Sequence, residues 1–322
     1  MLDLIIIGGG PAGLTAGLYG ARARMNLVLL ERLAPGGQVM NTNWVENYPG
    51  FPDGISGFDL VDRMKSQAEK FGLEIRSEEV VGLELRPDEK VVTTPERKIK
   101  TRTVILATGA TWRKLGIEGE DILTGKGVSY CATCDGPFFK DMEVAVIGGG
   151  DTALEESLFL TRFAKKIHVI HRRDELRATK LLQERAMAEE KISFVWDTVP
   201  IRILGDKEVE GLELKNVNTG EITRKAVQGV FVFIGTTPNT ELVKDQLKLD
   251  QGGFVITNEN METSVPGVFA AGDVRSKMFR QIATAVGEGA AAAHAAEKYV
   301  EDRGKGEVIR KQRERGRTTE DR

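Results

Sequence analysis

The sequence predicts an α/β fold in which two similar units are each built around a parallel sheet. Short, continuous apolar runs at Leu4–Ile7 and Val144–Ile147 are typical of parallel strands that are buried on both faces. Each run ends in a glycine-rich turn, G-x-G-x-x-G from Gly8 and G-x-G-x-x-A from Gly148, and a helical pattern follows each turn. The length of 322 residues is ample for two domains with cores of their own.

Composition narrows the classes of partner and compartment. The chain has 45 Lys and Arg against 48 Asp and Glu, so we expect neither a nucleic-acid nor a membrane partner. No apolar run approaches the ~20 residues that span a bilayer, and strand-like residues from Leu2 argue against a secretory signal. The only cysteines are Cys131 and Cys134, which excludes a disulfide framework and favours a reducing, cytoplasmic setting.

The first glycine-rich turn has the features of a dinucleotide site. Gly8 permits a tight turn, Gly10 permits close approach of a pyrophosphate, and Gly13 permits close packing of helix on strand. The following helix start offers N–H groups to phosphates. The next strand, Leu27–Leu30, ends at Glu31, where an acid binds ribose hydroxyls. The alternative is a glycine-rich turn in an unrelated α/β fold. The strand, the helix and the acid that accompany a dinucleotide-binding turn are, however, all present here.

The second turn differs in its charge. Gly148, Gly150 and Ala153 form the turn, and the strand Ile167–Ile170 leads into basic residues instead of an acid. These are His171, Arg172 and Arg173, with Arg177 following. Guanidinium groups bind phosphate in a forked geometry, whereas an acid would repel it. The pattern favours a ribose 2′-phosphate, and therefore NADPH over NADH; the alternative is a solvated, charged helix start.

Cys131 and Cys134 form a C-x-x-C pair just before the second turn, within Ser129–Ala153. A dithiol beside a dinucleotide site suggests transfer of an electron pair between a nucleotide and a disulfide. The alternative is half of a zinc site, which needs four Cys or His ligands. Only three histidines could complete it, and no metal is expected: His168, His171 and His294.

The remaining chain supplies elements and connections. We expect a loop without regular structure over Pro35–Pro52, an Ala-rich helix over Gln281–Val300, and a frayed, charged tail from Gly304. Residues Ile192–Leu214 suggest short antiparallel strands. Two segments, Trp112–Gly119 and Gly235–Asn239, read as crossings between domains.

These motifs resemble the low-molecular-weight thioredoxin reductases of bacteria and archaea over nearly the whole chain, excluding the tail. The specific pieces are C-A-T-C-D-G, G-G-G-D-T-A and H-R-R-D-E-L-R, supported by V-E-N-Y-P-G, A-T-G and V-F-A-A-G-D-V. The position of C-A-T-C immediately upstream of G-G-G-D-T-A is the discriminating feature. The larger glutathione-reductase-like enzymes carry their cysteines in the first nucleotide domain, where this chain has P-G-G-Q.

The resemblance implies two Rossmann-like domains, a homodimer, and thioredoxin as the protein substrate. FAD would bind a discontinuous domain, residues 1–113 and 242–322, and NADPH an inserted domain, residues 114–241. The inserted domain would rotate between two poses. The implied FAD contacts are Gly8, Gly10, Gly13, Glu31, Gln38, Asn47, Gly109, Asp273, Arg280 and Gln281. The implied NADPH contacts are Gly148, Gly150, Asp151, Thr152, Ala153, His171, Arg172, Arg173 and Arg177.

The resemblance also implies the chemistry. A hydride passes from NADPH to FAD, the electron pair passes to the Cys131–Cys134 disulfide, and the dithiol reduces thioredoxin through a mixed disulfide. Cys134 would face the flavin, Cys131 would attack the substrate, and Asp135 would act as general acid. The alternative for Asp135 is turn formation, because Asp-Gly-Pro is a turn signal.

Three other functions fit the sequence less well. A ferredoxin–NADP reductase of the same fold would need no dithiol. The reductase of a peroxide-reducing system usually carries an N-terminal thioredoxin-like extension. A redox sensor that only binds nucleotide would not need both the arginine cluster and the dithiol.

Overall fold

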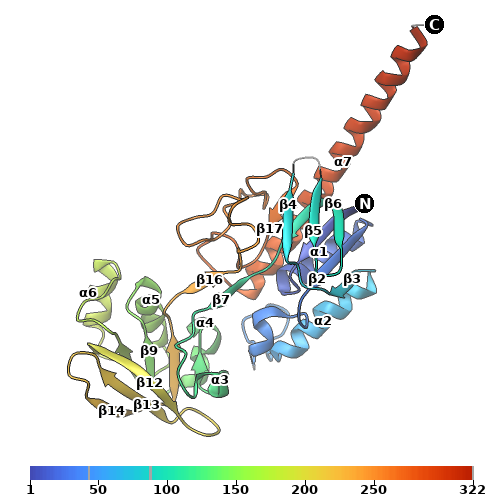
Figure 1. Cartoon of the computed structure of the whole chain (residues 1–322). Coiled ribbons are helices and arrows are strands. Elements are labelled where there is room, and N and C mark those ends of the chain that lie inside the picture. The colour runs from blue at the N-terminus through green and yellow to red at the C-terminus, as the bar shows by residue number, and fades with distance from the viewer. Residues whose placement is uncertain (43, 87–88, 321–322) are drawn as a thin grey trace. The chain divides into compact units, whose positions relative to one another are not determined.

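A computed structural model describes residues 1–42, 44–86 and 89–320 of the chain (Figure 1). The chain divides into two compact units. Unit 1 comprises residues 1–44, 48–111 and 237–322, and unit 2 comprises residues 45–47 and 112–236. The chain thus leaves unit 1 after Thr111 and returns to it at Thr237. The predicted α/β class is confirmed, because each unit contains a largely parallel sheet with helices.

The sheet of unit 1 has seven strands in the order β3-β2-β1-β6-β5-β4, and β17 also pairs with β6. Strands β1, β2, β3, β6 and β17 are parallel, while β4 and β5 are antiparallel. The strands are β1 (Leu2–Ile7), β2 (Leu27–Glu31), β3 (Glu74–Ser77), β4 (Gly82–Leu85), β5 (Lys90–Thr93), β6 (Lys98–Leu106) and β17 (Val268–Ala270).

Alternate residues along a strand of this sheet are buried on its two opposite faces. Leu4 and Ile6 of β1 belong to a cluster with residues of α1 (Pro11–Arg22) and α7 (Ile282–Glu320). Ile5 and Ile7 belong to a second cluster with β4, β5 and the segment around Val243. Burial of both faces explains the continuous apolar run of β1. Helix α2 (Gly57–Lys70) packs on the α1 side through Val61 and Ala68, and Ser56 caps its start.

Unit 2 contains a five-stranded parallel sheet in the order β11-β10-β9-β15-β8. Val144 and Val146 of β9 face α5 and α6, whereas Ala145 and Ile147 face a three-stranded antiparallel sheet. The elements are β8 (Val128–Ser129), β9 (Glu143–Ile147), α5 (Asp151–Leu160), β10 (Lys166–Ile170), α6 (Lys180–Ala188), β11 (Ile192–Val195), β12 (Thr198–Leu204), β13 (Gly211–Asn216), β14 (Ile222–Ala226) and β15 (Gly229–Val232).

The two crossings between the units pair with each other. Strand β7 (Ala110–Trp112) and strand β16 (Thr236–Pro238) form a two-stranded sheet. On the side of unit 2, the N–H of Arg113 donates to the carbonyl of Gly235 at 3.0 Å. On the side of unit 1, the N–H of Asn239 donates to the carbonyl of Gly109 at 3.1 Å. Both crossings therefore have fixed main-chain partners.

Three expectations about single elements were wrong. The 35–52 loop contains a 3-10 helix, η1 (Gly37–Asn41), which buries Val39. Strand β11 pairs parallel with β10, not antiparallel, because the chain returns from α6 by a crossover that buries Ile192 against that helix. Helix α7 continues to Glu320, where a frayed tail was expected (Figure 1). The Lys, Arg and Glu of this stretch are good helix formers, which the lack of an apolar stripe obscured. The tail's last residues, 321–322, lie outside the described residues.

Candidate active site

The first glycine-rich turn joins β1 to α1 and is held by backbone contacts within unit 1. Gly8 has φ +106° and lies so close to the carbonyl of Ala107 that no Cβ fits. A Cβ on Gly13 would collide with the carbonyl oxygen of Gly8. Gly10 is different, because nothing lies within 4 Å of the place of its Cβ. Gly10 is also the N-cap of α1 and gives no side-chain cap, so this helix start can accept an external anion.

Glu31 closes this turn at the end of β2. Its Oε2 accepts a hydrogen bond from the N–H of Gly9 at 2.7 Å, and its Oε1 accepts one from the N–H of Leu33 at 3.0 Å. The carboxylate is only partly buried and retains acceptor capacity. The contact with Gly9 places an acid beside the turn, as expected for a group that binds ribose.

Other predicted FAD contacts reach the same turn from distant parts of unit 1. Gly37 lies against Gly10, which brings η1 and its exposed Gln38 to the turn. Gly109 has φ +69° and open space at its Cβ position. Asn47 instead falls in the short 45–47 segment that clusters with unit 2.

Asp273 follows β17 and sits beside the start of α1, because Gly272 packs against Ala12. Its Oδ1 is buried without a hydrogen-bond partner among the described residues, although Lys277 Nζ lies 3.2 Å away in an ion pair. Glu288 accepts the N–H of Gly272 at 2.7 Å and also pairs with Lys277. Asp273 Oδ1 therefore has a cationic partner and can still accept a further hydrogen bond.

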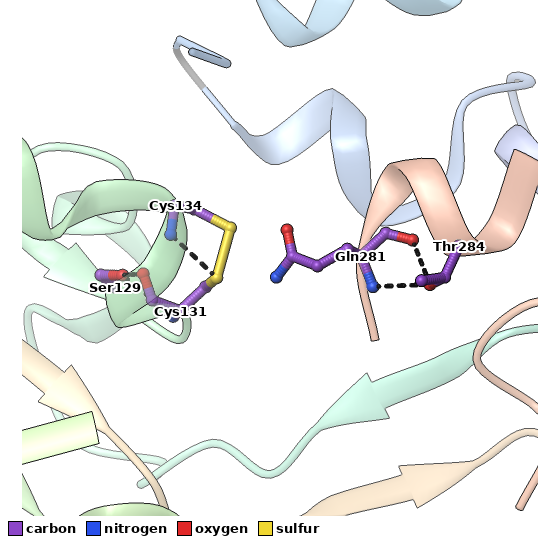
Figure 2. The surroundings of a disulfide bond; sticks show 5 residues. All are labelled: Ser129, Cys131, Cys134, Gln281 and Thr284. Atoms are coloured by element: carbon purple, nitrogen blue, oxygen red, sulfur yellow. Dashed lines mark hydrogen bonds between the residues drawn. A yellow bond between two sulfur atoms is a disulfide. The ribbon is translucent and has the colours of Figure 1, made fainter. Parts of the chain in front are cut away.

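Arg280 and Gln281 precede α7. The guanidinium group of Arg280 lies 4.0 Å from the ring centre of Phe254, and burial is the main cause that lowers the pKa of Arg280. The N–H of Gln281 donates to Thr284 Oγ1 at 3.1 Å, and this hydroxyl donates to the carbonyl of Gln281 at 2.9 Å (Figure 2). The Thr284 hydroxyl thus orders the start of the helix, as a capping group does.

The second turn, between β9 and α5, repeats the geometry in unit 2. Gly148 has φ +155° and lies against the carbonyl of Phe233, while Gly150 has open space and caps α5 without a side-chain bond. Ala153 is fully buried. Asp151 accepts the N–H of Thr179 at 2.7 Å, and Thr152 is exposed on the first turn of α5.

The basic residues after β10 surround this turn. His171 is buried against Gly149, and its Nε2 bonds the carbonyl of Glu175 at 3.0 Å. Burial is the main cause that lowers the pKa of His171, which keeps the ring neutral near pH 7. Arg172, Arg173 and Arg177 are exposed, and the N–H of Arg177 donates to the carbonyl of Gly149 at 2.7 Å. The His171 ring thus packs against the turn, while the three arginine side chains remain accessible to an anion.

Cys131 and Cys134 form a disulfide, with 5.3 Å between their Cα atoms (Figure 2). Cys131 precedes the single-turn helix α4 (Ala132–Asp135), and the N–H of Cys134 donates to Cys131 Sγ at 3.2 Å. The N–H of Cys131 donates to Ser129 Oγ at 3.1 Å. The pair expected from the C-x-x-C spacing is thus present as a disulfide.

Two carboxyl groups of unit 2 border this disulfide segment. Burial raises the pKa of Asp135, and a hydrogen bond with Ser129 partly opposes the rise. Burial likewise raises the pKa of Glu156 on α5, and interaction with the main-chain amides of Ala132 and Thr133 partly opposes this rise. A carboxyl group held toward its neutral form beside a disulfide can supply a proton to a departing thiolate.

Sequence reasoning missed three contributors. Glu156 stands in an acidic helical stretch with no motif, Lys277 lies shortly after G-D-V, and Glu288 lies in the Ala-rich helix. Only their burial and ion pairing in the fold distinguish them from surface charges. In the part of the chain that the structure describes, no group of three or more His, Cys, Asp or Glu side chains could hold a metal ion. No helix there is long and apolar enough to cross a membrane.

Comparison with known proteins identifies relatives over almost the whole chain. Residues 2–289 match the family described as "Pyridine nucleotide-disulphide oxidoreductase". A thioredoxin reductase of Peptoclostridium litorale is 50% identical over 306 residues, covering 93% of this chain and 97% of that protein. One from Streptomyces coelicolor is 50% identical over 301 residues, covering 92% and 94%.

The solved structures agree. The thioredoxin reductase of Streptococcus pyogenes is 49% identical and superposes with a TM-score of 0.91, covering 94% of this chain and 99% of that one. These matches confirm the resemblance drawn from C-A-T-C and G-G-G-D-T-A. The chain belongs to the pyridine nucleotide-disulphide oxidoreductase family and, within it, to the low-molecular-weight thioredoxin reductases.

Proposed function

We propose that this chain is a thioredoxin-disulfide reductase that uses FAD and NADPH and works as a cytoplasmic homodimer. The observation that carries the proposal is the Cys131–Cys134 disulfide, which lies in the same unit as the arginine-flanked turn. The relatives named thioredoxin reductase share about half of their residues with this chain and match it over more than nine tenths of its length.

The residues of unit 1 fit FAD. The open space at Gly10 and the uncapped start of α1 suit a pyrophosphate, and Glu31 stands where it can bind ribose hydroxyls. The buried Oδ1 of Asp273 pairs with Lys277 but makes no hydrogen bond within the described residues, so it can accept one from a hydroxyl of the cofactor. We propose Gln38, Gly109, Arg280 and Gln281 of unit 1 as further FAD contacts, together with Asn47 from the 45–47 segment.

The residues of unit 2 fit NADPH. Gly148 and Gly150 provide the turn, Ala153 packs beneath it, and Asp151 and Thr152 stand at the start of α5. Three exposed arginines supply the positive charge that a 2′-phosphate needs. They are Arg172, Arg173 and Arg177.

When bound, the nicotinamide supplies a hydride and the flavin relays its electron pair to the disulfide. The residues of the chain then complete the exchange. Cleavage of the Cys131–Cys134 bond takes up two electrons and two protons. The Cys131 thiolate attacks the thioredoxin disulfide and releases one thioredoxin thiol. The Cys134 thiolate then attacks Cys131 in this mixed disulfide, which restores the Cys131–Cys134 bond and frees the second thiol.

Asp135 is the proposed proton donor in this exchange. It follows Cys134 directly, and burial raises its pKa toward the range in which a carboxyl group keeps a proton. A protonated Asp135 delivers that proton to the leaving thiolate. The turn that Asp135 forms with Gly136 is compatible with the same role.

The test is NADPH oxidation by the purified protein with thioredoxin as the only acceptor. Cys131→Ser and Cys134→Ser should both still reduce the flavin with NADPH, but neither should turn over thioredoxin, because one thiol cannot carry an electron pair as a disulfide. Cys134→Ser should trap a mixed disulfide with a thioredoxin that lacks its resolving cysteine. Full thioredoxin activity in either variant rules out the proposed exchange.

A further inference from the structure

Four charged side chains of unit 1 form a cluster around Asp273, together with Arg275, Lys277 and Glu288. Lys277 Nζ lies 3.2 Å from Asp273 Oδ1 and 3.2 Å from Glu288 Oε2. Arg275 Nη1 lies 2.9 Å from Glu288 Oε1. The side chains of Lys277 and Glu288 are only 9% and 14% exposed. Water and salt screen such pairs less than surface pairs, so these charges act strongly on one another.

The cluster lies at the first turn of α1. Gly272, which precedes Asp273, packs against the Cβ of Ala12. Gly289, which follows Glu288 in α7, lies so close to the carbonyl of Ala12 that no Cβ fits. Glu288 Oε2 also accepts the N–H of Gly272 at 2.7 Å, which ties α7 to this segment. Under the proposed function, the start of α1 holds the pyrophosphate of FAD.

A carboxylate without a counter-charge would repel that pyrophosphate. Like charges in a partly buried site repel each other more strongly than they do in water. Among the described residues, the cation in ion-pair contact with Asp273 is Lys277. Arg280 donates instead to the main-chain carbonyls of Asp273 and Arg275, at 3.4 Å and 3.2 Å. Asp273 therefore depends on Lys277 for its counter-charge.

We propose that Lys277 is a positioning residue for the cofactor, which neutralises the Asp273 carboxylate so that this acid can bond a hydroxyl of FAD without repelling the pyrophosphate. The inference rests on the proposed function, because it takes FAD as the ligand of unit 1. Lys277 acts through Asp273 and not by contact with FAD. The two residues should therefore contribute to FAD binding as one unit and not additively.

The Kd for FAD tests the inference, measured by quenching of flavin fluorescence when the flavin-free full chain is titrated with FAD. Lys277→Met removes the charge but keeps a long side chain, and it should raise the Kd by about tenfold to a hundredfold. Lys277→Arg keeps a cation and should stay within about threefold of the unaltered protein. An unchanged Kd in Lys277→Met contradicts the inference.

A double variant separates neutralisation from simple packing. Asp273→Asn alone should raise the Kd, because the bond from FAD to a carboxylate is lost. Combined with Lys277→Met, the same change removes an unpaired charge. The double variant should therefore bind FAD about threefold to tenfold more tightly than Lys277→Met alone. If Lys277 only packs, the two losses add, and a double variant that binds no more tightly than Lys277→Met overturns the proposal.

Lys298→Met is the matched control, because it removes an exposed cation, paired with Glu301, from α7 of the same unit. It should leave the Kd for FAD unchanged. An equal rise in Kd in this control and in Lys277→Met would mean that any positive charge on unit 1 serves, and not the counter-charge of Asp273.

Glu288→Gln is a second test that keeps Lys277 and decides the matter if Lys277→Met does not fold. The amide oxygen can still accept the N–H of Gly272, while one negative charge disappears from the cluster. The Kd for FAD should be equal to or lower than that of the unaltered protein, and a higher Kd contradicts the inference. If the unaltered protein binds no FAD, the proposed function itself fails, whereas FAD binding that is alike in all variants defeats only this inference.

Discussion

The two glycine-rich turns have nearly the same backbone and opposite surroundings. In both turns, the first glycine has positive φ and lies against a carbonyl, and the third residue has open space at the place of its Cβ. The two turns differ in the residues that come directly after the second strand of each unit. Glu31 places a carboxylate on the first turn, whereas His171 fills the equivalent space with a neutral ring and leaves arginines exposed. We propose that the shared backbone geometry provides each dinucleotide site and that these few side chains select the nucleotide.

A second difference concerns the segments that gather at each turn. The disulfide segment lies just before the second turn along the chain and packs on its helix α5. The first turn instead receives η1 and the segment at Asp273 from later parts of the chain. Unit 1 therefore gathers distant segments around one turn, whereas unit 2 combines a turn with local redox groups.

The largest effect is expected at Gly13 of the first turn. Gly13→Ala puts a methyl group into the carbonyl of Gly8, which should cost about 3 kcal/mol, the upper end of typical overpacking. We expect a Tm lower by roughly 6–12 °C and little bound flavin. Gly10→Ala is the control, because its Cβ meets nothing. It should keep the Tm of the flavin-free protein and weaken only FAD binding; equal losses of Tm in the two variants contradict the account.

The next effect concerns Asp135. Asp135→Asn should slow thioredoxin reduction by about a hundredfold, because a positioned proton donor contributes at least that much. Only the protonated acid works, so the rate of the unaltered protein should fall as pH rises through the raised pKa of Asp135. The Asn variant should lack this fall, while flavin reduction by NADPH stays intact. If the rate falls with pH in the same way in both proteins, the fall is caused by another group and not by Asp135.

Arg172→Ala and Arg173→Ala test the charge difference between the turns. Each loses a charge-assisted bond to the 2′-phosphate and should raise the KM for NADPH by about tenfold to a hundredfold. The kcat/KM for NADH, which has no such phosphate, should change little. Arg224→Ala removes an arginine paired with Glu213 on the antiparallel sheet and serves as the control. Equal use of NADPH and NADH by the unaltered protein contradicts the assignment.

The smallest effect is expected at Glu31. Glu31→Gln keeps an acceptor for the N–H of Gly9 but loses one of the two oxygens that the carboxylate offers. The Kd for FAD, measured by quenching of flavin fluorescence, should rise about twofold to tenfold, as for one lost hydrogen bond. An unchanged Kd for FAD in this variant would show that Glu31 does not bind the cofactor.

The fold class, the family and the disulfide were predictable because each rests on local pattern. The β-turn-α units follow from apolar runs and glycine spacing, and C-x-x-C brings its sulfurs together within one turn. Features that depend on distant partners were not predictable. The parallel pairing of β11 depends on how α6 returns to the sheet, and the position of Glu156 depends on the packing of α5 against the disulfide segment. Helix α7 beyond Val300 was missed because charged helices lack an apolar stripe.

One measurement tests the central claim, that an electron pair from the nucleotide at the arginine-flanked turn ends on Cys131 and Cys134. Purified FAD-loaded protein is mixed with excess NADPH without oxygen, then quenched in acid, and its thiols are counted. We expect two new thiols per chain with NADPH, and far fewer with the same concentration of NADH. Flavin that is reduced by NADPH while no thiols appear would contradict it.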